Sequence, residues 1–181
     1  MFTQQKITTV QYLHSTFGPF IQELRNEITG EMKQQYRKKP IIFTNGCFDI
    51  LHYGHICLLE LAFQYGILVV AVNCDFTVKE VKPNRPIINE SARLRTVAAL
   101  QFVSFVLLMA EPTPHKLLEV LQPDFLAKGD EYSHDQVVGH EVVESYGGKI
   151  LRLPMTLGFS TSLIEERILQ CHQKSQSSAT T

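Results

Sequence analysis

Two histidines, His52 and His55, lie three positions apart where a short apolar run passes into a helical pattern. Gly54 between them has no Cβ, so a bulky phosphate can approach the backbone closely there. The first turn of a helix offers unpaired N–H groups and the positive end of its dipole. Two imidazole donors beside such a helix start can stabilise negative charge. The pattern therefore predicts a phosphate-binding site in residues 44–55.

The elements that position this site alternate along the chain. Five apolar runs have strand length and are each followed by a helical pattern: 41–43, 67–72, 102–108, 125–127 and 150–153. The helical patterns cover 56–65, 90–100, 114–121, 135–146 and 161–170. Strands alternating with helices indicate a parallel sheet covered on both faces. We expect an α/β fold with a single Rossmann-like, doubly wound, five-stranded parallel sheet, whose ligands bind beyond the carboxyl ends of the strands.

The chain divides into three predicted regions. Residues 1–38 carry apolar side chains at helical spacings, so we expect a helical N-terminal extension that packs on the main domain. A dimerisation arm is the alternative for this region. Residues 39–170 hold the alternating strands and helices and form the main domain. Residues 171–181 end in small polar side chains, and we expect a disordered tail.

Composition excludes several classes of protein. The 181 residues contain 17 Lys and Arg against 18 Asp and Glu, which argues against a non-specific nucleic-acid binder. No apolar run approaches the roughly 18 residues needed to span a bilayer, and residues 1–10 lack the apolar core of a secretory signal. The four cysteines form no C-x-x-C pair. We therefore expect a cytoplasmic protein with reduced thiols and neither nucleic acid nor membrane as a partner.

Residues 44–55 resemble a known signature. They read Thr-Asn-Gly-Cys-Phe-Asp-Ile-Leu-His-Tyr-Gly-His, similar to the T-N-G-C-F-D-x-L-H-x-G-H of the cytidylyltransferase-like nucleotidyltransferases. Residues 72–82 resemble the family's V-N-x-D-x-x-x-K-x-x-K block. Residues 123–129 resemble P-D-x-L-x-K-G, and residues 158–164 resemble G-x-S-T-[ST]-x-I. The blocks are most similar to the heptose 1-phosphate adenylyltransferase of bacterial ADP-heptose synthesis.

The resemblance implies an enzyme. In this family a substrate phosphate attacks the α-phosphate of a nucleoside triphosphate and releases pyrophosphate. We expect transfer of AMP from ATP to a phosphorylated small molecule, such as the sugar phosphate heptose 1-phosphate. Mg²⁺ would arrive with the triphosphate, without dedicated metal ligands in the protein. Members are often dimers, so the resemblance also implies a possible homodimer.

The resemblance assigns roles to individual residues. His52, His55 and Lys79 are the expected catalytic residues, with the lysine bridging the two reacting partners. The expected nucleotide-binding residues are Thr44, Asn45, Gly46, Cys47, Phe48, Asp49, Gly54, Asn73, Asp75, Arg93, Lys128, Gly129, Asp130, Ser160, Thr161 and Ser162.

Some of these residues have a second interpretation. Arg93 could form a surface ion pair instead of contacting phosphate. Asp75 could be the N-cap of a short helix, and one hydroxyl of residues 160–162 should cap the last helix. The other histidines are interpreted as surface or packing residues: His14, His115, His134, His140 and His172.

Three departures from the family pattern leave the substrate open. Asp130 and Glu131 stand where the family usually has Gly and Asp, and Pro83 stands where it usually has Gly. Met155 stands where glycerol-phosphate cytidylyltransferases place an arginine. Alternatives are therefore a CTP-dependent glycerol-phosphate or phosphoethanolamine cytidylyltransferase, and an FAD-synthetase-like adenylyltransferase. A catalytically inactive nucleotide-binding regulatory protein is the alternative outside enzymes.

Overall fold

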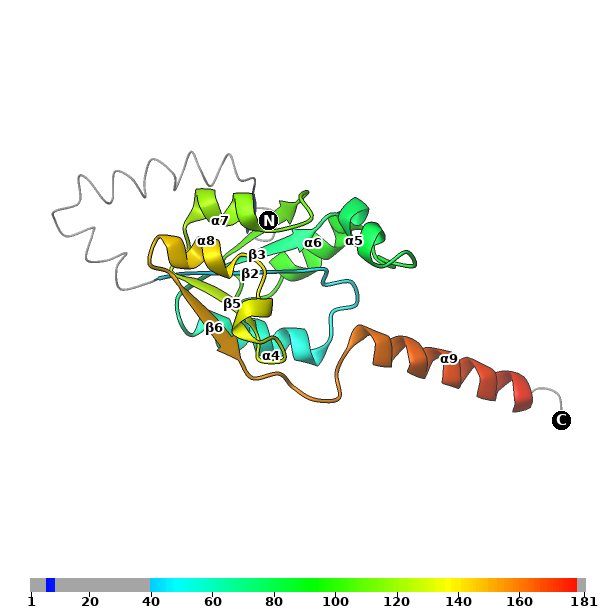
Figure 1. The fold of residues 1–181 in the computed structure, drawn as a ribbon. Coiled ribbons are helices and arrows are strands. Elements are labelled where there is room, and N and C mark those ends of the chain that lie inside the picture. The colour runs from blue at the N-terminus through cyan, green and yellow to red at the C-terminus, as the bar shows by residue number, and fades with distance from the viewer. Residues whose placement is uncertain (1–5, 9–39, 179–181) are drawn as a thin grey trace.

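A single parallel sheet organises the part of the chain that the computed structural model describes, residues 6–8 and 40–178 (Figure 1). The strand order is β1-β4-β3-β2-β5-β6, and every neighbouring pair is parallel. The strands are β1 (Ile7–Thr8), β2 (Ile41–Gly46), β3 (Ile67–Asn73), β4 (Phe105–Met109), β5 (Phe125–Gly129) and β6 (Lys149–Leu153).

All five predicted strands are present, so the α/β, Rossmann-like prediction is confirmed. The predicted strand number was one too low, because Ile7 and Thr8 add a sixth strand beside β4. Two residues are too short to produce a recognisable apolar run. Apart from residues 6–8, the predicted helical extension of residues 1–38 lies outside the described residues.

Helices cover both faces of the sheet. They are α4 (Tyr53–Phe63), α5 (Asp75–Val81), α6 (Glu90–Ala98), α7 (His115–Leu121), the 3₁₀ helix η1 (His134–Gln136), α8 (His140–Ser145) and α9 (Thr161–Ser178). Along β3, Val70 packs in one core cluster with Leu59 of α4 and Val97 of α6. Val69 packs in a second cluster with Leu118 of α7. Such a strand, buried on both faces, appears in the sequence as a continuous apolar run.

The strand order reverses between β2 and β5. After β2, the chain forms β3 and β4 on one side of this strand. It then crosses to the other side of β2, where it forms β5 and β6. Loops leaving two neighbouring strands at such a point diverge to opposite faces and leave a crevice between them. The carboxyl ends of β2 and β5 are therefore the place to examine for a ligand site.

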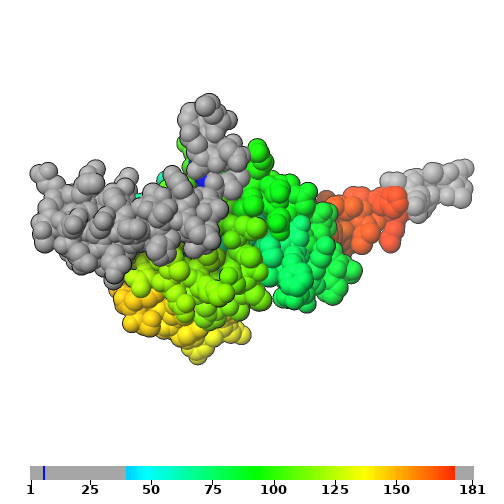
Figure 2. All heavy atoms as spheres, turned by 90° about the horizontal axis from the view of Figure 1, so that it is seen from above, coloured from blue at the N-terminus to red at the C-terminus, as the bar shows by residue number. Residues whose placement is uncertain are grey.

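Two predicted helix boundaries were wrong. The helix expected over 135–146 is divided into η1 and α8, because Gly139 has a φ of 93°, which an α-helix does not accommodate. The tail expected to be disordered is helical as far as Ser178, since no Gly or Pro interrupts α9. This helix extends away from the sheet (Figures 1 and 2). Among the described residues, no helix combines the length and hydropathy needed to cross a membrane.

Candidate active site

The two histidines meet at the start of α4, directly after β2. His52 is the N-cap of this helix, and its Nδ1 accepts a hydrogen bond from the backbone N–H of His55 at 3.4 Å. The two rings stack with centroids 3.8 Å apart and an interplanar angle of 22°. Gly54 allows this arrangement, because a Cβ at that position would lie 3.2 Å from the His52 ring. The helix start thus presents two imidazoles together.

Burial makes both imidazoles weak bases. Desolvation lowers the pKa of His52, and desolvation together with the charge of His52 lowers the pKa of His55 to about 4. Near neutral pH His55 is therefore uncharged and keeps one N–H donor. Its Nδ1 is buried without a hydrogen-bond partner in the described structure. An anion beside the pair would favour the protonated ring and raise the pKa of His55.

The loop that precedes the histidines has a constrained backbone. Phe48 is buried and has a φ of 51°, in the left-handed region. Its ring lies 5.2 Å from that of His55. A Cβ on Gly46 would come within 3.2 Å of the same phenyl ring. Thr44 is buried in β2, and Asn45 at the end of this strand has a buried Oδ1 that lacks a partner among the described residues.

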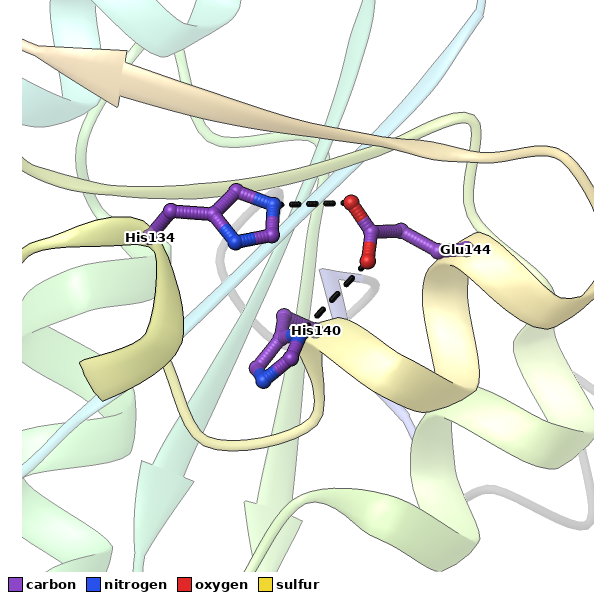
Figure 3. A group of neighbouring side chains, drawn as sticks. All are labelled: His134, His140 and Glu144. Atoms are coloured by element: carbon purple, nitrogen blue, oxygen red, sulfur yellow. Dashed lines mark hydrogen bonds and ion pairs between the residues drawn. The ribbon is translucent and has the colours of Figure 1, made fainter.

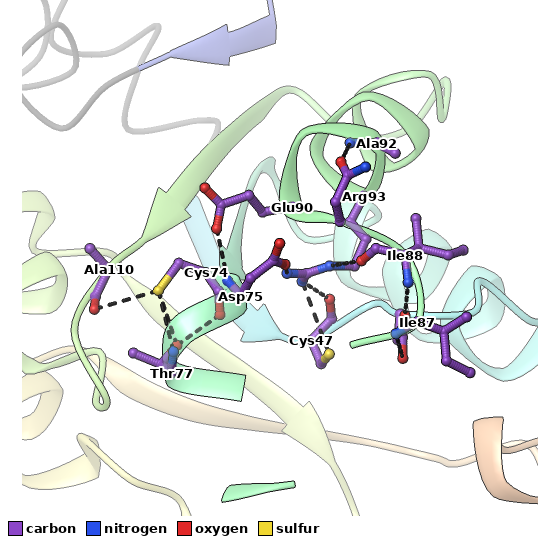
Figure 4. Close-up of polar contacts among 12 residues, drawn as sticks. Cys47, Cys74, Asp75, Thr77, Ile87, Ile88, Glu90, Ala92, Arg93 and Ala110 are labelled. Atoms are coloured by element: carbon purple, nitrogen blue, oxygen red, sulfur yellow. Dashed lines mark hydrogen bonds and ion pairs between the residues drawn. The ribbon is translucent and has the colours of Figure 1, made fainter. Parts of the chain in front are cut away.

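Arg93 is a buried positioning residue in this structure. Its side chain has no exposed surface, and its guanidinium donates to the backbone oxygens of Cys47 and Ile88 (Figure 4). Its Nη2 lies 2.6 Å from a carboxylate oxygen of Asp75. The surface ion pair considered for Arg93 is therefore wrong. The predicted phosphate contact is not available in this arrangement, because these protein groups surround the guanidinium.

Asp49 holds a distant segment against the histidine loop. Its buried carboxylate accepts hydrogen bonds from the backbone N–H groups of Ile87 and Ile88 at 2.8–2.9 Å. Arg85 lies 3.5 Å from the same carboxylate and also pairs with Glu165 of α9. Asp49 was predicted to bind nucleotide, and in this structure its carboxylate binds the backbone of residues 87–88 instead. The pairing of Arg85 was missed, although the Arg-Pro dipeptide at 85–86 marks this turn.

The residues after β3 are only partly brought into the site. Asn73 ends the strand, and Cys74 caps α5, its Sγ accepting from the N–H of Thr77. The N-cap interpretation of Asp75 was therefore wrong. Lys79 lies exposed in the last turn of α5. No hydrogen bond or ion pair within residues 40–178 joins this lysine to His52 or His55.

Lys128 of β5 contacts β2 at the reversal point, the place between these two strands where the strand order reverses. Its ammonium donates to the backbone oxygen of Asn45 at 2.8 Å. Burial lowers the pKa of Lys128 to about 8, although the charge of Glu131 opposes this shift. The lysine is therefore mostly charged at neutral pH. It places a positive charge between the carboxyl ends of β2 and β5.

Two of the departures from the family pattern lie against each other around Gly129. A Cβ there would overlap a carboxylate oxygen of Glu131 and lie 2.6 Å from the sulfur of Met155. Asp130 accepts a hydrogen bond from the backbone N–H of Met155 at 3.1 Å. Two of the departures, at residues 130–131 and 155, thus form one local arrangement.

A cavity of about 200 Å³ opens at the reversal point. Asn45 and Lys128 line it from the strand ends, and residues 112–114 line it from the loop after β4. The opposite wall is Tyr132 together with residues 136–138. Sequence reasoning assigned no site role to residues 136–138, because it predicted one continuous helix over 135–146, which the chain divides at Gly139.

The last helix begins beside the first. Ser160 is the residue that caps α9, since its Oγ accepts from the N–H of Leu163 at 3.2 Å. Thr161 and Ser162 follow in the first turn. The rings of Phe159 and Tyr53 meet edge to face with centroids 5.1 Å apart. Two helix starts, each with unpaired N–H groups, therefore lie side by side.

Residues 43–167 match the family described as cytidylyltransferase-like. This match covers the histidine pair, the strand reversal and the first turn of α9. The chain belongs to the cytidylyltransferase-like family. As a member of this family it is a nucleotidyltransferase, which confirms the predicted class of enzyme.

Relatives of this cytidylyltransferase-like chain include the bifunctional protein HldE of Syntrophotalea carbinolica, 41% identical over 143 residues. The match covers 78% of this chain and 29% of that protein. The bifunctional protein HldE of Geotalea uraniireducens is 46% identical over 137 residues, covering 75% of this chain and 28% of that protein. The chain thus spans less than a third of the length of these relatives.

Solved structures share the same fold. The lipopolysaccharide core biosynthesis protein of Thermoplasma volcanium superposes with a TM-score of 0.57 at 28% identity, covering 65% of this chain and 98% of that chain. The pantoate-beta-alanine ligase of Francisella tularensis superposes with a TM-score of 0.51 at 18% identity, covering 83% and 67%. At that identity the second comparison supports the fold alone.

Proposed function

We propose that this chain transfers AMP from ATP to a sugar 1-phosphate, such as heptose 1-phosphate, and releases pyrophosphate. The observation that carries the proposal is the stacked, uncharged pair of His52 and His55 at the start of α4, beside the start of α9. The similarity to the bifunctional HldE proteins supports a sugar phosphate as the acceptor.

The reaction requires stabilisation of charge more than covalent catalysis. An oxygen of the acceptor phosphate attacks the α-phosphorus, the bond to the bridging oxygen breaks, and pyrophosphate leaves. Negative charge on the α- and β-phosphate oxygens is met by the imidazoles of His52 and His55 and by the N–H groups of the two helix starts. Lys79, on α5, would supply a mobile positive charge between the reacting partners.

Mg²⁺ enters this proposal as part of the substrate. The nearby carboxylates are already engaged, since Asp49 holds residues 87–88 and Asp75 pairs with Arg93. These side chains fit an ion carried by the triphosphate better than a resident ion with its own cage. When bound, Mg²⁺ neutralises charge on the phosphate oxygens.

The cavity at the reversal point suits one sugar or base ring. Pockets that enclose a whole drug-sized ligand occupy roughly 300–1,000 Å³, and this cavity holds about 200 Å³. Lys128 and Asn45 would fix polar groups of that ring. Asp130 and Glu131, next to the cavity, are the residues that we expect to select the acceptor.

The test is release of pyrophosphate from ATP or CTP with Mg²⁺ and a panel of acceptors. The panel holds heptose 1-phosphate, other sugar 1-phosphates, glycerol 3-phosphate, phosphoethanolamine and FMN. We expect release with ATP and a sugar 1-phosphate. His55→Ala should lower kcat by about 10²–10³-fold, the usual effect of removing one transition-state donor. His172→Ala, a substitution on exposed α9, is the matched control and should retain activity.

Other outcomes select the alternatives. Release only with CTP and an alcohol phosphate, or only with FMN, would overturn the substrate assignment and keep the reaction type. Tight nucleotide binding without release for any acceptor on the panel would favour the regulatory protein.

A further inference from the structure

A second group of histidines lies outside the active site, on η1 and α8. His134, His140 and Glu144 point toward one another (Figure 3). The Nε2 of His134 lies 2.8 Å from one oxygen of Glu144, and the Nδ1 of His140 lies 3.4 Å from the other. Within the described part of the chain, one nitrogen or oxygen from each residue lies within 4.8 Å of the others. Two imidazoles and one carboxylate thus lie within reach of one ion.

The outer nitrogen of each ring also faces a carboxylate. The Nδ1 of His134 lies 3.2 Å from Asp135, and the Nε2 of His140 lies 3.8 Å from Glu141. Histidines that bind metal ions commonly donate their other N–H to such a carboxylate, which fixes the tautomer and the direction of the ring. His134 therefore has the inner and outer partners of a metal ligand, and His140 has an outer carboxylate at ion-pair distance.

We propose that His134, His140 and Glu144 bind a transition-metal dication of the Zn²⁺ type. Two imidazole nitrogens and one carboxylate oxygen are a zinc donor set that leaves a position for water. Mg²⁺ and Ca²⁺ prefer sets made of oxygen alone. With uncharged rings, Asp135, Glu141 and Glu144 make the surroundings negative, which attracts a cation.

The side chains have room to close on an ion. Ligand atoms about 2.0–2.2 Å from a tetrahedral zinc lie roughly 3.3–3.5 Å apart. From the present arrangement, the 2.8 Å contact between His134 and Glu144 must open, and the two ring nitrogens, which lie within 4.8 Å of each other, must approach. His134 and Glu144 are exposed and His140 is half-buried, so side-chain rotation can supply this movement, and an ion can enter directly from solvent.

An ion here would fix one wall of the cavity. His134 belongs to η1, whose last residue Gln136 lines the cavity together with Val137 and Val138. Gly139 then turns the chain into α8, which carries the other two ligands. An ion bound by His134 and by the two α8 residues would cross-link η1 to α8 and hold the turn between them in one conformation. The ion would therefore act as a structural clamp on the substrate side of the enzyme.

The experiment measures Zn²⁺ binding to the full chain after removal of any affinity tag. We expect one Zn²⁺ per chain by equilibrium dialysis and calorimetry, and a visible tetrahedral spectrum with Co²⁺. His134→Ala and His140→Ala should each weaken binding by at least about tenfold. His172→Ala, on α9, should bind as the wild type does. Mg²⁺ in large excess should not displace Zn²⁺.

Glu144→Gln guards against a folding artefact, because it preserves the size of the side chain and removes its charge. Weaker Zn²⁺ binding in this variant, with unchanged circular dichroism, would support the site. Zn²⁺ should also raise the melting temperature of the wild type and leave that of His134→Ala unchanged. Absence of Zn²⁺ binding to the wild type, or equal affinity in the His134→Ala/His140→Ala double variant, would overturn the proposal.

Discussion

The chain carries two pairs of histidines in opposite surroundings. His52 and His55 stack on each other, are partly buried, and have no carboxylate partner in the described structure. His134 and His140 tilt at 56° with centroids 5.0 Å apart, and carboxylates face both nitrogens of each ring. Histidine side chains thus lie beside apolar groups in the first pair and beside carboxylates in the second.

The difference decides what each pair can bind. Desolvation lowers the pKa of His55 to about 4, whereas hydrogen bonds to Asp135 and Glu144 raise the pKa of His134. An uncharged pair beside a helix start suits an anion, and a pair among carboxylates suits a cation. The groups around a histidine therefore indicate its chemistry better than its spacing in the sequence does.

Removing the buried charge of Arg93, which holds the loop before the first histidine pair, should have the largest effect on stability. Arg93→Met leaves Asp75 and the backbone oxygens of Cys47 and Ile88 without their donor. We expect the free energy of unfolding to fall by about 3–5 kcal/mol, as when one partner of a buried ion pair is removed. Urea unfolding measures this change. Arg95→Met, on the exposed face of the same helix, should cost less than about 1 kcal/mol, and equal effects would contradict the role of Arg93.

The first pair should also make the fold sensitive to acid. The pKa of His55 is about 4 in the folded chain, against an ordinary value of 6.5. Between these values the unfolded chain binds more protons, so stability falls as the pH drops from 6.5 toward 4. The shift corresponds to about 3 kcal/mol at most. Urea unfolding across this range should show a shallower pH slope in His55→Gln, and an unchanged slope would contradict the prediction.

The stacking of the first pair can be disturbed without removing a histidine. Gly54→Ala places a Cβ 3.2 Å from the His52 ring and 3.4 Å from the backbone oxygen of Phe159. The ring must shift, and we expect kcat to fall about tenfold, or about 1.4 kcal/mol in the activation free energy. Steady-state kinetics measures the change. Unchanged kcat would show that the spacing of the rings does not matter for the reaction.

In the second pair, His134 and His140, loss of a single carboxylate should change the pKa of His134 by a small amount. Glu144→Gln removes one of the two groups that raise the pKa of His134, so this pKa should fall toward 6.5. Titration of the histidine ring protons by NMR measures the shift. Glu119→Gln, at an exposed position of α7, is the control and should leave the titration unchanged. A pKa of His134 that stays raised would assign the effect to Asp135 alone.

Local sequence patterns predicted the sheet and the histidine pair. Strands such as β3 are buried on both faces and therefore appear as continuous apolar runs. His52, Gly54 and His55 are neighbours in the chain, so the helix start alone brings them together. Ser160 as a cap follows from the same kind of local rule.

Contacts between distant segments could not be predicted in this way. Arg93 donates to Cys47, 46 positions earlier, and Asp49 accepts from Ile87, 38 positions later. Neither pairing leaves a periodic signal, and a single sequence does not show which arginine will be buried. His134 and His140 were interpreted as surface or packing residues. His140 and Glu144 are four positions apart on one helix, so their contact could have been predicted from the sequence. His134 lies before the turn at Gly139, and its approach to them could not.

The projecting helix has a mechanical consequence. Arg85 connects the first turns of α9, through Glu165, to Asp49 in the histidine loop, and the rest of the helix extends outward. Its 18 residues make a rod about 27 Å long. A rotation of about 10° at Ser160 would move the far end by roughly 5 Å. The helix would thus amplify a small rotation at its start. Exposed Cys171, part-way along it, would move by roughly 3 Å, which a fluorophore attached there could report.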